Sequence, residues 1–356
     1  MKKFNAFFRK NLFYLVLTSM FFGFLFGWQF QDFAPKLKAL IVPLLFLMIY
    51  VMIVPMEFRE LVDLRKYKKE TLLGIFAILV LAPLIAYFVN FILPGKYEFL
   101  KAGLILAATM PPGGMIVSWT GLLNANVELA MVLQTITFVL AIVAIPLTLS
   151  LLLSKSIRFS KTLLVKNILL YIFVPLIIGF ITQLILRKKY SKEKIKSWKP
   201  TLATISGLCA LGVVFISVSL KTKAIITHPQ VLLWGILLAF IYYLITFLAS
   251  LFTVGLFVDS YDSQMPIVYG TACKNLSIGI ALALSVFKGP VVLGVIVCSM
   301  IQMPMLSLFY KFIRKEEQEF AEEVEEERRK RHPISLALRK IRKAKNEFKK
   351  VEKSKG

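Results

Sequence analysis

One charged residue stands out in the apolar part of the sequence. Lys274, in TACKNLSIG (271–279), is the only charge near the middle of an apolar segment. The other charges outside the connectors and the tail lie at segment ends: Glu57, Lys101, Glu128 and Lys311. A charge at the centre of a membrane helix costs about 2.5–3.5 kcal/mol on insertion scales, so an intramembrane lysine indicates a functional site.

Three interpretations of Lys274 are open at this stage. The side chain could snorkel to a membrane surface, although snorkelling favours helix ends. It could be structural, with its ammonium satisfied by carbonyls freed where helices break. It could also bind an anionic substrate or take up and release a proton, since buried lysines change protonation state readily. The last two interpretations are compatible.

Residues for other kinds of chemistry are scarce. Cys209, Cys273 and Cys298 have no CxxC spacing, and His228 and His332 are the only histidines. Paired carboxylates, a histidine centre and an activated nucleophile are not visible near the middle of any apolar segment. The sequence therefore predicts a protein that is not an enzyme, with no cofactor and no metal site.

A second interruption occurs in TMPPGG (109–114). Pro111 and Pro112 remove two backbone donors and Gly113 and Gly114 add flexibility, so a helix should break there. Broken helices at membrane depth are tolerated where they line a cavity, and their ends suit ions or polar substrates. The two interruptions together therefore predict a transport site.

The elements that hold these residues are long apolar segments. The chain has 356 residues, 58% of them hydrophobic, and a mean hydropathy of +0.73. A spanning helix needs roughly 20 apolar residues, so we expect an all-α polytopic membrane protein. Ten such runs are present: 11–30, 39–56, 71–93, 100–123, 127–153, 164–186, 200–220, 229–257, 263–287 and 289–313.

The order of these segments indicates an inverted repeat. We expect one five-helix repeat at 1–153, a second at 154–313, and a charged cytoplasmic tail at 314–356. An odd number of spans per repeat makes the second enter from the opposite face. The interrupted segments are then helices 4 and 9, which are counterparts in the two repeats.

Basic connectors at 57–70 and 187–200 indicate the cytoplasmic side, so both termini of this multi-pass cell-membrane protein are expected inside. SKSIRFSK (154–161) fits poorly, because it is basic on the opposite side. The net charge of +24 lies in connectors and tail, which favours anionic lipid headgroups over nucleic acid as partners. The tail beyond 331 could be a basic amphipathic helix on the inner leaflet or a solvated charged segment.

The two interrupted segments carry a resemblance. PPGGMIVSWTGLLNANVEL and ACKNLSIGIALALSVF are similar to the superfamily of bile acid:sodium symporters and arsenite-efflux permeases, over residues 1–313. The resemblance implies a panel domain and a core domain, with helices 4 and 9 crossing in the core beside the substrate cavity.

The symporter branch has P-G-G-x-x-S-N at its first break and E-x-x-x-Q-N at its second, where two sodium ions bind. Pro112, Gly113, Gly114 and Asn275 match these patterns. In this chain the Ser-Asn positions are occupied by Val117 and Ser118. The Glu position is occupied by Gly270 and the Gln position by Lys274. Because an ammonium repels sodium, the sequence predicts transport that is not coupled to sodium.

The arsenite branch matches in other residues. Met115 and Trp119 fit its P-C-x-x-M-x-x-x-W pattern, but its thiol position is Pro112 and the acid of S-N-N-x-E is Ser277. Arsenic(III) favours soft thiolates. An arsenite or metalloid efflux permease is therefore the alternative, with a passive channel or membrane sensor as an alternative of another class.

These observations predict a secondary active transporter of a small organic anion or similar solute. The expected binding residues are Pro112, Gly113, Gly114, Ser118, Cys273, Lys274, Asn275 and Ser277. Gln134, Thr135 and Thr137 are weaker candidates, because lone polar residues in spans often serve helix packing.

Overall fold

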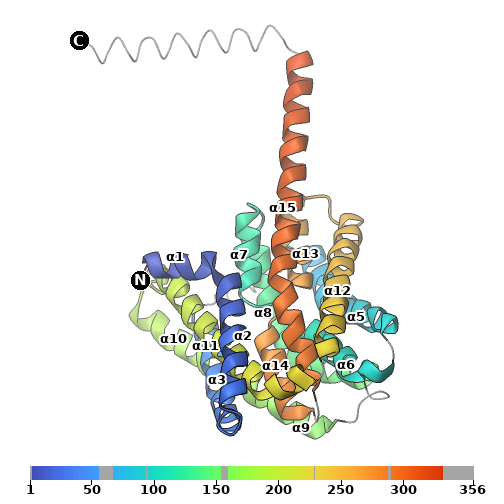
Figure 1. Cartoon of the computed structure of the whole chain (residues 1–356). Coiled ribbons are helices and arrows are strands. Elements are labelled where there is room, and N and C mark those ends of the chain that lie inside the picture. Colours follow the sequence, from blue (N-terminus) through green and yellow to red (C-terminus); the bar gives the residue numbers. More distant parts are fainter. Residues whose placement is uncertain are drawn as a thin grey trace, which may run out of the picture. The chain divides into compact units, whose positions relative to one another are not determined.

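The computed structural model of the chain describes residues 2–55, 67–93, 95–153, 159–227, 229–287 and 290–331. Every named element within these ranges is a helix, which confirms the all-α class (Figure 1). Seven helical stretches are long and apolar enough to cross a membrane. They are Ala34–Val51, Lys68–Ile92, Val127–Leu153, Lys161–Lys189, Glu193–Lys223, Pro229–Gly255 and Val291–Arg314.

The first helix of residues 2–153 precedes the expected segments, and the others follow them. They are α1 (Lys2–Lys10), α2 (Leu12–Gln29), α3 (Ile41–Ile53), α4 (Lys68–Phe76), α5 (Ala82–Val89), α6 (Glu98–Thr109), α7 (Met115–Leu122) and α8 (Val127–Leu153). A π-helical turn, η3 (Ala77–Leu81), joins α4 to α5. Three short 3₁₀ turns complete this part: η1 (Ala34–Leu40), η4 (Asn90–Ile92) and η5 (Gly95–Tyr97).

The helices of residues 159–331 begin with α9 (Lys161–Ile168), which continues through a second π-helical turn, η6 (Leu169–Phe173), into α10 (Val174–Lys189). The others are α11 (Lys192–Thr227), α12 (Pro229–Gly255), α13 (Tyr261–Ala272), α14 (Leu276–Val286) and α15 (Val291–Arg331). Helix α15 extends beyond the expected end of the tenth span at residue 313. The possible amphipathic helix beyond 331 lies outside the described residues.

Each of the ten apolar segments is helical, and helices 4 and 9 are interrupted as expected. Helix α6 ends at Thr109 and α7 begins at Met115, whereas α13 ends at Ala272 and α14 begins at Leu276. Both breaks are therefore confirmed. Shorter apolar helices, Tyr14–Gln29 and Leu276–Val286, accompany the seven long ones. A full count of ten membrane crossings and their inverted symmetry remain predictions.

One group of helices packs around α11, which contacts α2, α3 and α1, while α10 packs on α3 (Figure 1). Small residues allow α2 to approach the α11 backbone closely: a Cβ on Gly27 would lie 2.3 Å from the Ser219 carbonyl oxygen. The Ser219 hydroxyl donates to the Gly23 carbonyl at 2.9 Å. Small residues and hydroxyl bonds of this kind are how membrane helices associate.

A second group contains α4 to α8 together with α12 and α13, which contact one another. Gly103 in α6 meets Gly294 in α15, where an added Cβ would lie 2.7 Å from the facing Cα. Backbone contact of this closeness requires glycine on both helices. This contact places α6, the first half of interrupted helix 4, directly against α15.

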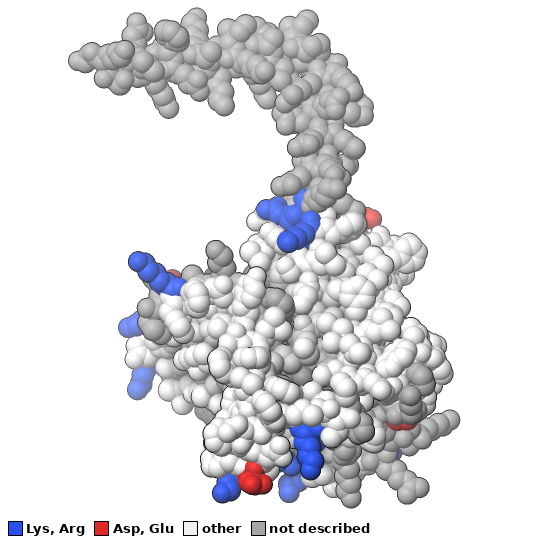
Figure 2. All heavy atoms as spheres, viewed as in Figure 1, with Lys and Arg blue, Asp and Glu red and all other residues white. Residues whose placement is uncertain are grey.

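The chain divides into two compact units, Met1–Ser307 and Leu308–Gly356. Figure 2 shows lysine and arginine side chains at the lower end and the left edge of the visible face, with a broad uncharged surface between them. Large apolar side chains are exposed on the first unit, including Phe91 (71%), Leu151 (70%), Leu233 (70%) and Phe252 (69%). Such a surface fits hydrocarbon rather than water, so this is a multi-pass membrane protein.

Candidate functional site

The two helix breaks lie against each other. Pro112 and Lys274 form an isolated antiparallel bridge, and the Asn275 N–H donates to the Pro111 carbonyl at 2.8 Å. A proline pair cannot continue a helix, so its carbonyls become available to the opposite strand-like segment. The two interruptions, which lie far apart in the chain, thereby form one crossing.

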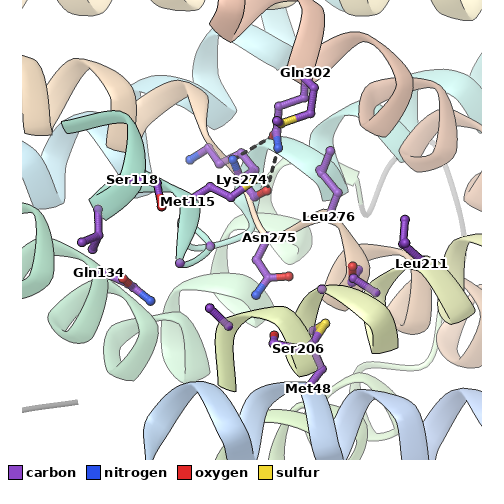
Figure 3. A pocket seen from close by; sticks show the side chains of 18 of the residues that line it. Met48, Met115, Ser118, Gln134, Ser206, Leu211, Lys274, Asn275, Leu276 and Gln302 are labelled. Atoms are coloured by element: carbon purple, nitrogen blue, oxygen red, sulfur yellow. Dashed lines mark hydrogen bonds between the residues drawn. The ribbon is translucent and has the colours of Figure 1, made fainter. Parts of the chain in front are cut away.

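Gln302 on α15 satisfies the backbone of the second break. The Lys274 N–H donates to Gln302 Oε1 at 2.8 Å, and Gln302 Nε2 donates to the Lys274 carbonyl at 3.1 Å (Figure 3). The Tyr243 hydroxyl on α12 donates to the same Oε1 at 3.1 Å. Buried backbone groups need partners when water is absent, and one primary amide supplies both a donor and an acceptor.

The Lys274 ammonium is buried and bound to a third helix. The residue is 1% exposed, and its Nζ donates to the Ile78 carbonyl at 2.7 Å. The ammonium therefore does not reach a membrane surface, as snorkelling would require. Its acceptor also differs from the freed carbonyls expected at 109–114 and at the break in helix 9, because it belongs to the segment between α4 and α5.

The π-helical turn η3 explains why that carbonyl is available. The Ala82 N–H donates to Ala77, five residues back, so it does not serve Ile78. The next residue, Pro83, has no N–H to donate in the π register. The Ile78 carbonyl is left outside the helical ladder, and the lysine supplies the missing donor with a charge-assisted bond.

Apolar side chains surround the nearby Gly270. A Cβ at this position would lie 2.8 Å from Ile116 Cδ1 and 3.1 Å from Ile78 Cδ1. This is the position where the symporter pattern has its glutamate. The space for a carboxylate is therefore filled by two isoleucine side chains.

A cavity of about 420 Å³ lies beside the crossing (Figure 3). Six expected site residues line it: Gly113, Gly114, Ser118, Lys274, Asn275 and Ser277. Pro112 forms the bridge instead, and Cys273 is fully buried and is not among the lining residues. Of the weaker candidates, Gln134 and Thr135 line the cavity, whereas the Thr137 hydroxyl donates to the Leu133 carbonyl within α8.

The wall of the cavity combines apolar side chains with uncharged polar groups. Its polar side chains are Ser118, Gln134, Thr135, Ser206, Asn275, Ser277, Ser299 and Gln302. Four methionines, Met48, Met115, Met131 and Met303, give it an adaptable apolar surface. Among the described lining residues, Lys274 is the one that can carry a charge. Such a wall suits a small organic solute with hydrogen-bonding groups.

Helix α1 also contributes to the wall of the cavity. Phe8, 4% exposed, lines the cavity, and its ring lies against Gly207 of α11, where an added Cβ would be 2.4 Å from the ring. The Asn5 amide donates to the Thr201 hydroxyl at 3.1 Å. The first helix is thus fixed to α11 by one aromatic contact and one hydrogen bond.

Sequence reasoning missed Gln302, Tyr243 and Ile78. Gln302 lies in an apolar segment and offered a signal, since an isolated amide in a spanning helix needs a partner. Tyr243 and Ile78 offered none of their own. For Ile78 the signal was Pro83. A proline inside a helix indicates an irregular turn, but it does not identify the group that binds the carbonyl freed there.

The described residues contain no group of three or more histidine, cysteine or acidic side chains that could hold a metal ion. The crossing consists of backbone groups, amides, hydroxyls and one ammonium.

The fold and the crossing define a class: a helical membrane transporter with paired discontinuous helices beside a central cavity. Comparison with known proteins identifies the family. The chain belongs to the Sodium Bile acid symporter family, whose model matches residues 42–228. The matched range includes the first break and excludes the second, which carries Lys274.

Two Bacillus subtilis proteins are similar to this chain. "Uncharacterized protein YbaS" is 21% identical over 254 residues, which covers 71% of this chain and 81% of that protein. "Uncharacterized sodium-dependent transporter YocS" is 26% identical over 234 residues, covering 65% of this chain and 68% of that protein.

Proposed function

We propose that this protein is a secondary active transporter of a small organic anion or similar solute, and that transport does not depend on sodium. The observation that supports this is the 2.7 Å bond from Lys274 Nζ to the Ile78 carbonyl beside the crossing. The lysine acts as a tethered cation at the position where the symporter pattern holds sodium.

The surroundings of Lys274 argue against a sodium site of the symporter kind. Sodium, like other hard cations, is held by oxygen ligands. Here the Ile78 carbonyl accepts a hydrogen bond from the Lys274 ammonium. The position of the pattern's glutamate is occupied by Gly270, against which two isoleucine side chains pack. A second cation would be repelled by the ammonium at low effective dielectric.

The same charge supports an anionic substrate. Among the described residues, the Lys274 ammonium forms no ion pair with a carboxylate, and its hydrogen bond is to a neutral carbonyl. A buried ammonium without a counter-charge is costly, and an anion in the adjacent cavity would lower that cost. The hydroxyls and amides of the wall would then orient the rest of the solute.

Alternating access is supported by the composition of the cavity wall. Phe8, Met48 and Ser206 come from the helices packed around α11, whereas Ser118, Gln134 and Asn275 come from the group with the broken helices. Movement of one group against the other would open the cavity to alternate sides, as in a ten-span inverted repeat. We also propose that both termini lie inside, because the basic connectors at 57–70 and 187–200 favour the cytoplasmic side.

The test uses purified protein in proteoliposomes and begins with a ligand screen. Organic anions, amino acids and arsenite are tested by thermal unfolding, because a solute that binds only the folded state raises the unfolding midpoint. The solute found is then measured for uptake and counterflow with sodium or choline outside. Equal uptake in both salts supports the proposal, and clear stimulation by sodium would overturn it.

Lys274→Gln is the informative variant, and Lys101→Gln is its matched control. Lys101 is partly buried but pairs with Glu98 at 3.3 Å, away from the lining residues. We expect Lys274→Gln to weaken anion binding and Lys101→Gln to leave it unchanged.

Saturable counterflow distinguishes a carrier from a passive channel. Arsenite has little support, because none of the three cysteines is among the described lining residues.

A further inference from the structure

A surface groove lies along α9, η6 and the start of α10, away from the crossing. Three polar side chains are at one end and four apolar side chains continue along the helix. The lining residues are Lys161, Thr162, Val165, Lys166, Leu169, Leu170 and Val174. None of these residues also lines the cavity beside the crossing.

The apolar part of this groove is exposed on the surface of the protein. Val165, Leu169, Leu170 and Val174 are 42%, 40%, 43% and 36% exposed. They belong to the stretch Lys161–Lys189, which is long and apolar enough to span a bilayer. The two lysines stand at the first turns of that stretch, so they lie at the depth of lipid headgroups.

The π-helical turn η6 brings the apolar residues into line. The Val174 N–H donates to Leu169, five residues back, and the following residue, Pro175, has no N–H. The extra residue in this turn places Val174 on the same face as Leu169, whereas a regular helix would rotate it away. The result is a continuous apolar strip below the lysines.

The charges of this region are otherwise unexplained. In the topology expected from the basic connectors, SKSIRFSK (154–161) is basic on the side of the membrane where basic residues should be scarce. Lys161 and Lys166 are exposed and form no ion pair with a carboxylate of the described chain. Two lysines directly above an apolar strip are complementary to a negatively charged headgroup above an acyl chain.

We propose that this groove binds an anionic phospholipid. The phosphate lies between Lys161 and Lys166, and one acyl chain packs along Leu169, Leu170 and Val174. The Thr162 hydroxyl is placed to donate to a phosphate or ester oxygen of the same lipid. This site is separate from the cavity and does not depend on what the protein transports.

The experiment measures lipid binding to the purified full-length chain in a neutral detergent. Phosphatidylglycerol is compared with phosphatidylcholine of the same acyl chains, by native mass spectrometry and by the thermal unfolding midpoint. Near an anionic headgroup each lysine contributes roughly a fivefold gain in affinity. We therefore expect phosphatidylglycerol to bind at least about tenfold more tightly at low salt.

Two variants and one control locate the site. Lys161→Gln/Lys166→Gln should remove the preference for phosphatidylglycerol, whereas Lys36→Gln/Lys38→Gln, which removes the same charge from two other exposed lysines, should keep it. Val165→Trp should fill the groove and weaken binding of both lipids while the charge is retained. The unfolding midpoint without lipid shows that each variant is folded.

Other outcomes would overturn the proposal. Equal binding of the two lipids by the unmodified chain would show that the lysines do not select a headgroup. An equal loss of the preference for phosphatidylglycerol in the two double-lysine variants would indicate attraction of the lipid to the overall charge of the surface. Stabilisation by glycerol phosphate to the same extent as by phosphatidylglycerol would indicate a site for free phosphate, with no role for the apolar strip.

Discussion

Sodium sensitivity can be introduced by design if Lys274 replaces a coupling ion. The proposed change is Ile116→Val/Gly270→Glu/Lys274→Gln, which restores the carboxylate and amide of the symporter pattern at the second break. Ile116→Val is included because a Cβ at residue 270 would lie 2.8 Å from Ile116 Cδ1. Removing that methyl relieves the closer of the two contacts at this Cβ, because Ile78 Cδ1 lies at 3.1 Å, and costs about 0.5–1.5 kcal/mol of stability.

The expected magnitude follows from the position of the ammonium. Lys274 Nζ lies 2.7 Å from the Ile78 carbonyl oxygen, so a sodium ion bound to the same oxygen would lie close to the ammonium. Two positive charges about 4 Å apart repel by about 4 kcal/mol at an effective dielectric of about 20. That energy is equivalent to about a thousandfold weaker sodium binding in the unmodified chain than in a chain without the charge.

The assay is thermal unfolding of the purified protein in rising sodium chloride, with choline chloride keeping the ionic strength constant. An ion present at 100 times its dissociation constant raises the free energy of unfolding by about 2.7 kcal/mol. We expect the unmodified chain and the Ile116→Val control to respond equally to the two salts. The triple variant should be stabilised by sodium specifically.

A specific response of the unmodified chain to sodium would refute the reasoning, because the lysine would then not occupy the ion's place. A folded triple variant without any sodium response would show that charge replacement at positions 270 and 274 is insufficient. Folding is checked by gel filtration and by the unfolding midpoint in choline.

Further predictions concern the supports of the site. Gln302→Leu should destabilise the protein by about 3 kcal/mol or more, because it leaves the backbone donor and acceptor of Lys274 unpaired at roughly 1–3 kcal/mol each; Ser299→Ala, whose hydroxyl donates within its own helix, is the control in thermal unfolding. Pro83→Ala restores an N–H that competes for the Ile78 carbonyl, so solute binding should weaken while the unfolding midpoint changes little; unchanged binding would argue against the π-helical turn as the reason for the contact. Gly27→Leu should prevent close packing of α2 on α11 and lower the unfolding midpoint strongly, since its Cβ would lie 2.3 Å from a backbone oxygen; a stable variant would contradict that packing.

Much of the fold was predictable from the sequence because bilayer thickness and backbone satisfaction leave few solutions. Apolar runs of about 20 residues predict helices, and every expected segment is helical. Pro111-Pro112 with two glycines predicts a break through local chemistry alone, and α6 does end at Thr109. The break in helix 9 was also predictable, because a lysine and an asparagine interrupt an apolar run.

The environment of Lys274 was not predictable in the same way. The sequence determined that a buried charge would need a partner, but every turn of every neighbouring helix has carbonyls, and nearly all are occupied by their own helix. Only the tertiary structure decided that the partner is Ile78, 196 residues away, and that Gln302 holds the backbone. The physical reason is that helix packing specifies which irregular turn lies opposite which side chain, whereas local sequence specifies only that a turn is irregular.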